Sequence, residues 1–190
     1  MRRIFNLGMC LGMGVSLWAQ NSIVGAKPGD FTLRDLKDVE VASSTLSGNV
    51  TALLFISTSC PVSNAYNERM SALYRDYEPK GVKFIFVNSN ETEPAAEVAD
   101  HMRKHDFPFA VYKDPGSLVA DRFHAQATPE AFVLDAGGMV RYHGYIDDSQ
   151  NDQRVTKKSL RLALDAVLGG YRIDPAETKA FGCSIKRAKP

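Results

Sequence analysis

Apolar and polar positions divide the chain into short apolar runs of strand length and longer stretches with helical spacing. The runs at 52–56 and 82–87 have the length and composition of buried strands. Residues 131–135 and 139–146 flank a turn at 136–138, which indicates a β-hairpin. The pattern therefore predicts a sheet that contains these segments.

Helical spacing lies between and after these runs. Apolar residues recur on one face from Leu160 to Leu168, and this helix should end at 169–170, where two glycines stand. Thr92 predicts the cap of another helix, with Pro94 in its first turn. The expected helices run from 61 to a stop at 79–81, from 92 to about 106, over 118–123 and over 160–168. Strands that alternate with helices favour an α/β sheet with helices on both faces.

The two ends of the chain carry weaker patterns. Residues 30–33 and 39–41 alternate like the strands of a small hairpin. The tail from about 171 to 190 is polar and irregular apart from 181–186. With 190 residues and no internal repeat, the chain suits one domain over 20–190.

Residues 1–19 have the pattern of a secretory signal peptide. Arg2 and Arg3 precede an uncharged apolar run, and cleavage is expected after Ala19. Met9 is a poor match to the small residue that a lipoprotein signal needs before Cys10, so Cys10 should be lost with the signal. We therefore expect an exported protein, periplasmic or extracellular, with no membrane anchor after cleavage.

The charge of the chain argues against binding to nucleic acid or membranes, and its cysteines suggest a structural or a redox role. The signal holds two of the 23 basic residues and none of the 22 acidic ones, so cleavage changes the formal charge from +1 to −1. Such a chain has no excess charge to attract nucleic acid or an anionic membrane. Cys60 and Cys183 remain, and in an oxidising compartment they are either a structural bridge or a working redox couple.

Cys60 stands where the strand at 52–56 gives way to a helix. Pro61 suits the first helical position, which makes Cys60 the N-cap and brings its sulfur near the unpaired amides of the first turn. Those amides and the helix dipole stabilise a thiolate, the nucleophilic form. The position predicts a reactive thiol, although a lone cysteine after a strand is also often a small buried hydrophobe.

Four segments together resemble a known family. They are Phe55 to Pro61, Ala127 to Asp135, Tyr142 to Asp148 and Gly182 to Lys186. The combination, from about residue 25 to 186, resembles the peroxiredoxin-like branch of the redoxin superfamily, also called the alkyl hydroperoxide reductase and thiol-specific antioxidant family. The resemblance implies a thioredoxin-like three-layer α/β/α sandwich with a central mixed β-sheet and an N-terminal β-hairpin.

The resemblance also assigns a role to Thr128 and Pro129. In thioredoxin-like proteins the matching proline is cis and lies against the active-site sulfur, and the backbone before it is free to pair with an extended substrate. We therefore expect a cis Pro129 that supplies geometry and no chemistry, with Thr128 beside it.

The chain departs from the family at several positions. Ser63 replaces the second cysteine of a C-x-x-C motif, so no disulfide can close within the turn, and Ala127 stands where relatives often have a further cysteine. In the peroxiredoxin pattern Leu53 takes the proline position. Ser57 takes the threonine position and keeps a hydroxyl able to bond a thiolate or a peroxide oxygen.

Arg69 and Arg141 are the candidates for the arginine of a peroxiredoxin pocket. These departures remove parts of both the peroxiredoxin and the thioredoxin motif, whereas the cysteine needed for thiol chemistry is kept.

The leading hypothesis is a thiol-based oxidoreductase without cofactor or metal. The Cys60 thiolate attacks a peroxide or a disulfide, Cys183 resolves the intermediate, and an external thiol reductant such as a thioredoxin-like protein supplies electrons. The hypothesis is compatible with either a monomer or a homodimer. One alternative is a permanent Cys60–Cys183 bridge that pins the tail, which the chain-entropy model credits with about 4–5 kcal/mol.

A second alternative is a copper carrier. Exported thioredoxin-like carriers use C-x-x-x-C and a distant histidine, but Asn64 stands at the second cysteine position. Cys60 and Cys183 would need one of four scattered histidines: His101, His105, His124 or His143. Asp147 and Asp148 are either a solvated turn or a site for a cation or substrate group.

Overall fold

A computed structural model describes residues 22–187, and its core is a mixed sheet. Seven strands follow the order β2-β1-β5-β4-β3-β7-β8, and a second sheet joins β6 to β9. The strands are β1 Thr32–Arg34, β2 Glu40–Ala42, β3 Val50–Phe55, β4 Val82–Asn88, β5 Val111–Lys113, β6 Ala127–Thr128, β7 Glu130–Asp135, β8 Val140–Gly144 and β9 Cys183–Ser184. The predicted signal peptide, 1–19, lies outside the described residues.

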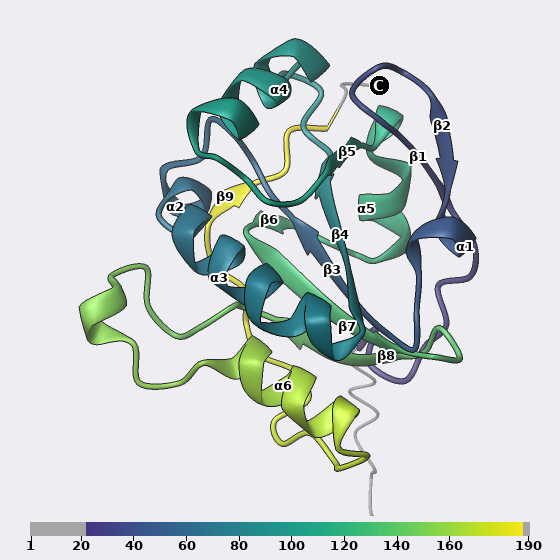
Figure 1. Cartoon of the computed structure of the whole chain (residues 1–190), viewed down its shortest axis with the longest axis vertical. Coiled ribbons are helices and arrows are strands. Elements are labelled where there is room, and N and C mark those ends of the chain that lie inside the picture. The colour runs from purple at the N-terminus through teal and green to yellow at the C-terminus, as the bar shows by residue number, and fades with distance from the viewer. Residues whose placement is uncertain (1–21, 188–190) are drawn as a thin grey trace, which may run out of the picture.

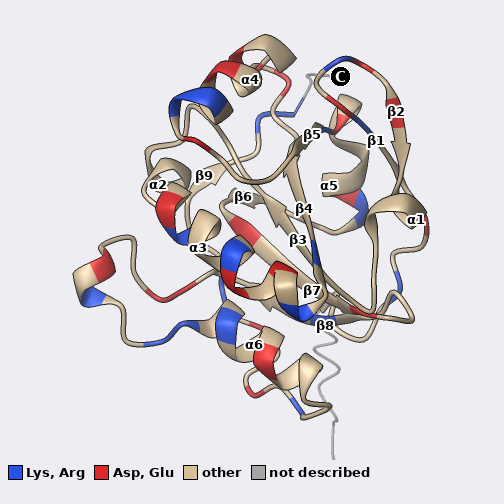
Figure 2. Ribbon diagram, viewed as in Figure 1, with Lys and Arg blue, Asp and Glu red and all other residues tan. Residues whose placement is uncertain are grey.

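Helices cover both faces of the sheet (Figure 1). The α-helices are α1 Ser43–Leu46, α2 Pro61–Asn64, α3 Asn67–Tyr77, α4 Ala95–Lys104, α5 Leu118–Arg122 and α6 Ser159–Leu168. Three 3₁₀ turns, η1 Glu78–Lys80, η2 Pro115–Ser117 and η3 Asp152–Arg154, complete the elements. Figure 2 shows residues of both charge signs on α3, α4 and α6. No helix within 22–187 is long and apolar enough to cross a membrane.

Strand β3 lies inside the sheet, between β4 and β7, and leads into the turn that carries Cys60. It pairs parallel with β4 and antiparallel with β7, so that Phe55 lies opposite Val87 on one side and Glu130 on the other. The ends of β3 and β4 and the start of β7 therefore meet at one edge. Residues that follow β3 or β4, or precede β7, are brought together there.

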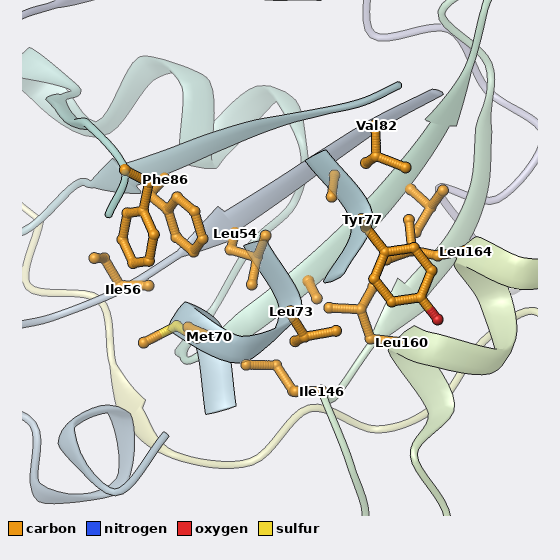
Figure 3. Packing of buried hydrophobic residues seen from close by; sticks show 14 of the residues in the cluster. Leu54, Ile56, Met70, Leu73, Tyr77, Val82, Phe86, Ile146, Leu160 and Leu164 are labelled. Carbon is orange, nitrogen blue, oxygen red and sulfur yellow. The ribbon is translucent and has the colours of Figure 1, made fainter. Parts of the chain in front are cut away.

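Successive side chains of β3 point into two different cores. Ala52 and Leu54 belong to the cluster with α3 and α6, in which Figure 3 shows Leu54 with Leu73 of α3 and Leu160 of α6. Leu53 and Phe55 pack with α5 on the other face. Burial on both faces explains why the sequence run is continuously apolar rather than alternating. The predicted three-layer sandwich with a mixed sheet is confirmed, and so is the N-terminal hairpin, formed by β1 and β2.

The single helix predicted after Cys60 is wrong, since the structure has two. The N–H of Tyr66 bonds to the carbonyl of Ser63, three residues back, at 3.0 Å, so α2 ends in a tighter turn before α3 begins. The break leaves the Tyr66 ring buried. The predicted stop is confirmed, because Gly81 ends η1 with a left-handed φ of 88°.

The start predicted for the next helix is also wrong. Helix α4 begins at Ala95, and Pro94 is its N-cap with extended backbone angles, so Thr92 lies outside it. The reason is Glu93, whose side chain turns inward and holds 88–93 as a polar loop. A helix over these residues would point that carboxylate elsewhere.

The tail is irregular, as predicted, yet it is closely docked. His143 of β8 donates its N–H to the Ala176 carbonyl at 3.1 Å and accepts from the Thr178 N–H at 2.9 Å. Gly144 makes this approach feasible, because a Cβ there would lie 1.9 Å from the Thr178 hydroxyl oxygen. The docked segment then leads to β9, which pairs with β6.

Candidate active site

Cys60 lies at the N-cap of α2, as predicted. Pro61 occupies the first turn, and the N–H of Ser63 donates to Cys60 Sγ at 3.3 Å. The residue is only 2% exposed. One amide donor therefore favours a thiolate, while burial opposes it.

The structure joins Cys60 to Cys183 in a disulfide. The two residues are 123 positions apart, and their Cα atoms lie 5.8 Å apart. Cys183 reaches Cys60 from β9, whereas Ser63, at the C-x-x-C position, is buried and accepts the Ser57 N–H at 3.1 Å. Sequence alone left this pairing open, because it depends on how the tail folds back.

The Thr128–Pro129 bond is cis, as predicted. The Thr128 carbonyl oxygen lies 3.3 Å from Cys60 Sγ, so it can accept a hydrogen bond from the reduced thiol. The Thr128 hydroxyl donates to the Cys183 carbonyl at 3.4 Å, and β6 pairs Thr128 directly with Cys183. Both cysteines therefore contact the loop before Pro129.

Ser57 contacts the backbone of Cys60 rather than its sulfur. Its hydroxyl accepts the Cys60 N–H at 3.1 Å and donates to Glu93 Oε1 at 2.5 Å. Since a hydroxyl has one proton, the proton of Ser57 is directed at Glu93 and away from the sulfur in this state.

Glu93 is the main residue that the sequence reasoning missed. It is 1% exposed, and its carboxylate accepts hydrogen bonds from seven donors. They are Ser57 Oγ, Thr58 N, Thr58 Oγ1, Ser59 N, Ser59 Oγ, Asn88 Nδ2 and Asn90 Nδ2. Burial alone would raise the pKa of Glu93, but these donors outweigh it and lower the pKa to about 2. Glu93 therefore stays ionised and fixes the turn before Cys60.

The network around Glu93 extends to the other cysteine. Asn90 donates to Glu93 through Nδ2 and, through Oδ1, accepts the Lys186 N–H at 2.6 Å. Lys113 Nζ donates to Asn88 Oδ1 at 2.6 Å and to the Glu93 carbonyl at 2.6 Å; its pKa is lowered by burial. The sequence did contain a signal for this network, because polar residues, at 88–90, directly follow the apolar run of β4, the strand beside β3.

The two candidate arginines are engaged elsewhere. Arg69 donates to both carboxylate oxygens of Asp147 at 2.8 Å, in a pair that is largely buried, and its guanidinium lies over the Tyr66 ring. Arg141 pairs with Asp135, which lies opposite the first residue of β3 and thus at the far end of the strand from Cys60. Asp147 is therefore the partner of a buried ion pair and not part of a solvated turn.

Asp148, its neighbour in the sequence, is half-buried and bonds within its own loop. It accepts the N–H of Thr156 at 2.8 Å and also bonds the Thr156 hydroxyl. It closes the loop that contains η3.

A second buried cluster supports the loop before Pro129. Glu130 Oε2 accepts the N–H groups of Gln126 and Ala127, both at 2.8 Å, and Glu130 Oε1 lies 2.6 Å from His143 Nε2. His143 Nδ1 lies 3.2 Å from Glu177 of the docked tail. Burial would lower the pKa of His143, but the two carboxylates reverse this and raise it.

Within residues 22–187, no group of three or more His, Cys, Asp or Glu side chains is arranged to hold a metal ion. The rings of His101 on α4 and of His105, the residue that follows α4, are tilted against each other with centroids 4.4 Å apart, and His143 lies between carboxylates. The cysteine sulfurs bond to each other instead of to a shared ligand.

The chain is similar to a known protein family and to named relatives. The model of the AhpC/TSA family matches residues 24–143. The thiol-disulfide oxidoreductase ResA of Bacillus cereus (strain ZK / E33L) is 27% identical over 145 residues, which cover 73% of this chain and 83% of the relative. The family match includes Cys60 and Pro129 and ends before Cys183.

Solved structures show the same fold. An uncharacterized conserved protein from Geobacillus kaustophilus superposes with a TM-score of 0.81 at 30% identity, over 90% of this chain and 95% of that one. Peroxidoxin BcpB from Mycobacterium tuberculosis superposes with a TM-score of 0.61 at 19% identity, over 78% of this chain and 97% of that one. The fold is thioredoxin-like.

Proposed function

The chain belongs to the AhpC/TSA family and is a thiol-based oxidoreductase, and we propose that its substrate is a disulfide, attacked by Cys60 and resolved by Cys183. The observation that carries the proposal is the pair itself. One cysteine is at a helix N-cap with an amide donor on its sulfur, and the other is bonded to it from a separate strand.

The reaction is two thiol–disulfide exchanges. The Cys60 thiolate attacks one sulfur of the substrate, which forms a mixed disulfide and releases the first substrate thiolate. The Cys183 thiolate then attacks Cys60 Sγ, which releases the second substrate thiolate and leaves the Cys60–Cys183 disulfide. The substrate gains two electrons and the protein loses two. An external thiol reductant, such as a thioredoxin-like protein, then restores both thiols.

Two observations favour a disulfide over a peroxide. Cleaving a peroxide requires donors on the leaving oxygen, yet the Ser57 hydroxyl donates to Glu93, and Arg69 and Arg141 are paired with carboxylates. The matched relatives are named thiol-disulfide oxidoreductases. A disulfide brings its own leaving group, a thiolate, and so needs no such donors.

The remaining site residues have positioning roles in this proposal. Ser57 orients the turn by accepting the Cys60 N–H, and Thr128 offers its carbonyl to the reduced thiol. Pro129 follows directly and shapes the loop. The signal-like pattern at 1–19 supports an exported protein, periplasmic or extracellular, made of one domain over 20–190.

The test uses the mature chain without residues 1–19, fully reduced and mixed with one equivalent of either a small disulfide or hydrogen peroxide. Sulfur states are mapped by mass spectrometry over time. We expect a mixed disulfide at Cys60 that converts to the internal bridge, and that accumulates in Cys183→Ser. Peroxide should react far more slowly, and Cys60→Ser should form no adduct.

Two outcomes would contradict the proposal. Faster oxidation by peroxide than by the disulfide would indicate a peroxidase. A Cys60 thiol that reacts with neither reagent would indicate a structural bridge.

A further inference from the structure

His143 of β8 connects two segments that carry active-site residues. Its Nε2 lies 2.6 Å from Glu130 Oε1, and its Nδ1 lies 3.2 Å from Glu177 Oε1. Glu130 directly follows Pro129, whereas Glu177 belongs to the docked tail. We call these three side chains, of His143, Glu130 and Glu177, the His143 link. The link joins the loop before Pro129 to the tail that carries Cys183.

On the loop side, the link fixes the backbone that faces Cys60. Glu130 is 3% exposed, and its Oε2 accepts two backbone N–H groups of the loop, both at 2.8 Å. The next residue of the loop is Thr128, whose carbonyl oxygen lies 3.3 Å from Cys60 Sγ. A carboxylate as deeply buried as Glu130 needs a partner for its charge, and His143 is that partner.

On the tail side, the link adds an ion pair to backbone hydrogen bonds. The N–H of His143 donates to the Ala176 carbonyl at 3.1 Å, and the His143 carbonyl accepts the Thr178 N–H at 2.9 Å. The Glu177 side chain between them is 45% exposed. Because this part of the tail runs on to Cys183, its docking helps to set where that cysteine lies.

The two side-chain bonds of the link together require a protonated ring. Each ring nitrogen faces a carboxylate oxygen, and a neutral imidazole has a single N–H, so only an imidazolium donates to both. Phe132 of β7 stacks on the ring with centroids 4.6 Å apart. Within 22–187 the charged groups that face the ring are therefore Glu130 of β7 and Glu177 of the tail. Burial lowers the pKa of His143, but these two carboxylates outweigh it and raise the pKa.

We propose that His143 is a positioning residue for the Cys60–Cys183 couple, and that its imidazolium form keeps Cys183 within reach of Cys60 by holding the tail to the loop. The proposal rests on the proposed function and adds regulation by pH to the same site. When the ring loses its proton, the remaining N–H stays with Glu130, because burial makes an unpartnered carboxylate costly there. The exposed Glu177 returns to water, and fewer bonds then hold the tail.

The consequence is a cysteine pair that becomes easier to reduce as the pH rises through the folded pKa of His143. The protein disulfide and two glutathione thiols exchange with the protein dithiol and one glutathione disulfide, which transfers two electrons. A Cys183 thiol held beside Cys60 acts at a high effective concentration and so favours the protein disulfide. Loss of one partly exposed ion pair should change this equilibrium constant about threefold.

The experiment measures the equilibrium with glutathione for the mature chain without residues 1–19, in the absence of oxygen. It runs from about pH 5 to about pH 9, a range that spans the titration of histidine. Acid quenching and mass spectrometry give the ratio of disulfide to dithiol. The test variant is Glu177→Gln, which breaks the exposed end of the link and leaves Glu130 paired with His143. Dividing the constant of the parent by that of the variant cancels the ionisation of glutathione.

A matched control separates the link from a general effect of charge. Asp174→Asn also removes an exposed carboxylate from the tail, but one that does not face His143. We expect the parent to favour its disulfide about threefold more than Glu177→Gln does near pH 5, and the two to converge near pH 9. Asp174→Asn should follow the parent at every pH. A second variant, His143→Gln, has no titrating ring and should lose the pH-dependent difference as Glu177→Gln does.

The outcomes separate the two proposals. Equal constants for the parent and Glu177→Gln at every pH would overturn the positioning role and leave the proposed function standing. A difference of the same size across the whole pH range would overturn the dependence on protonation of His143. Cysteines that do not exchange with glutathione at any pH would overturn the proposed function itself.

Discussion

Replacing Glu93 with glutamine removes the charge at the centre of the buried network and keeps the size of the side chain. Oε2 of Glu93 accepts from Thr58 N, Thr58 Oγ1 and Asn88 Nδ2, and Oε1 accepts from the remaining donors. A glutamine has one acceptor oxygen and one NH₂ group, so one of these sets loses its acceptor. Hydroxyls can rotate to new partners, but the fixed N–H donors cannot.

Two routes give a similar magnitude for Glu93→Gln. A buried donor left without a partner costs about 1–3 kcal/mol, so one or two fixed donors cost about 3 kcal/mol. The pKa of Glu93 is lowered from 4.5 to about 2, and at about 1.4 kcal/mol per pKa unit this also corresponds to about 3 kcal/mol. We therefore expect the free energy of unfolding to fall by about 3 kcal/mol at pH 7.

The sign of the pH dependence follows from the lowered pKa. Stabilisation by Glu93 is complete above the unfolded pKa near 4.5 and is lost as the pH falls toward 2. Urea denaturation with the disulfide intact, followed by circular dichroism at pH 7 and pH 3, measures it. The gap between the parent and Glu93→Gln should shrink by about 2 kcal/mol at pH 3. Glu97→Gln, on the exposed side of α4, is the control. If Glu97→Gln is as destabilising at pH 7, the reasoning is refuted.

Three further predictions concern the tail and the buried ion pair, each measured by urea denaturation. The raised pKa of His143 stabilises the fold below pH 6.5, and this stability should be lost as the pH rises through the folded pKa; a His143→Gln variant that keeps the same pH profile would contradict this. Gly144→Ala should cost about 2 kcal/mol more than Gly138→Ala, whose Cβ meets nothing within 4 Å, and equal costs would contradict the clash. Arg69→Met should cost about 3–5 kcal/mol because it strands the Asp147 carboxylate, and adding Asp147→Asn should recover part of that loss; no recovery would contradict the pairing.

What the sequence could predict here depended on local physics. The strand at 52–56 was predictable because both of its faces are buried, which leaves a continuous apolar run. The N-cap position of Cys60 was predictable because Pro61 suits only the start of a helix. Both features are determined by residues within a few positions of one another.

What it could not predict depends on distant contacts. The start of α4 shifted because Glu93 turns toward a loop more than thirty residues away in sequence. The role of Arg69 followed from Asp147 on another segment, and the partner of Cys60 from a tail that folds back across the molecule. None of these contacts has a periodicity or spacing that the sequence alone displays.

The two cysteine segments share one support, the loop at 88–93. Glu93 binds the turn before Cys60, while Asn90 and Glu91 bind the backbone of Lys186, three residues after Cys183. None of these bonds involves a sulfur, so reducing the disulfide leaves them in place. In the reduced state Lys186 should therefore stay attached and keep the Cys183 thiol close to Cys60. A tethered thiol attacks at a high effective concentration, so Cys183 should resolve a mixed disulfide at Cys60 faster than a thiol free in solution does.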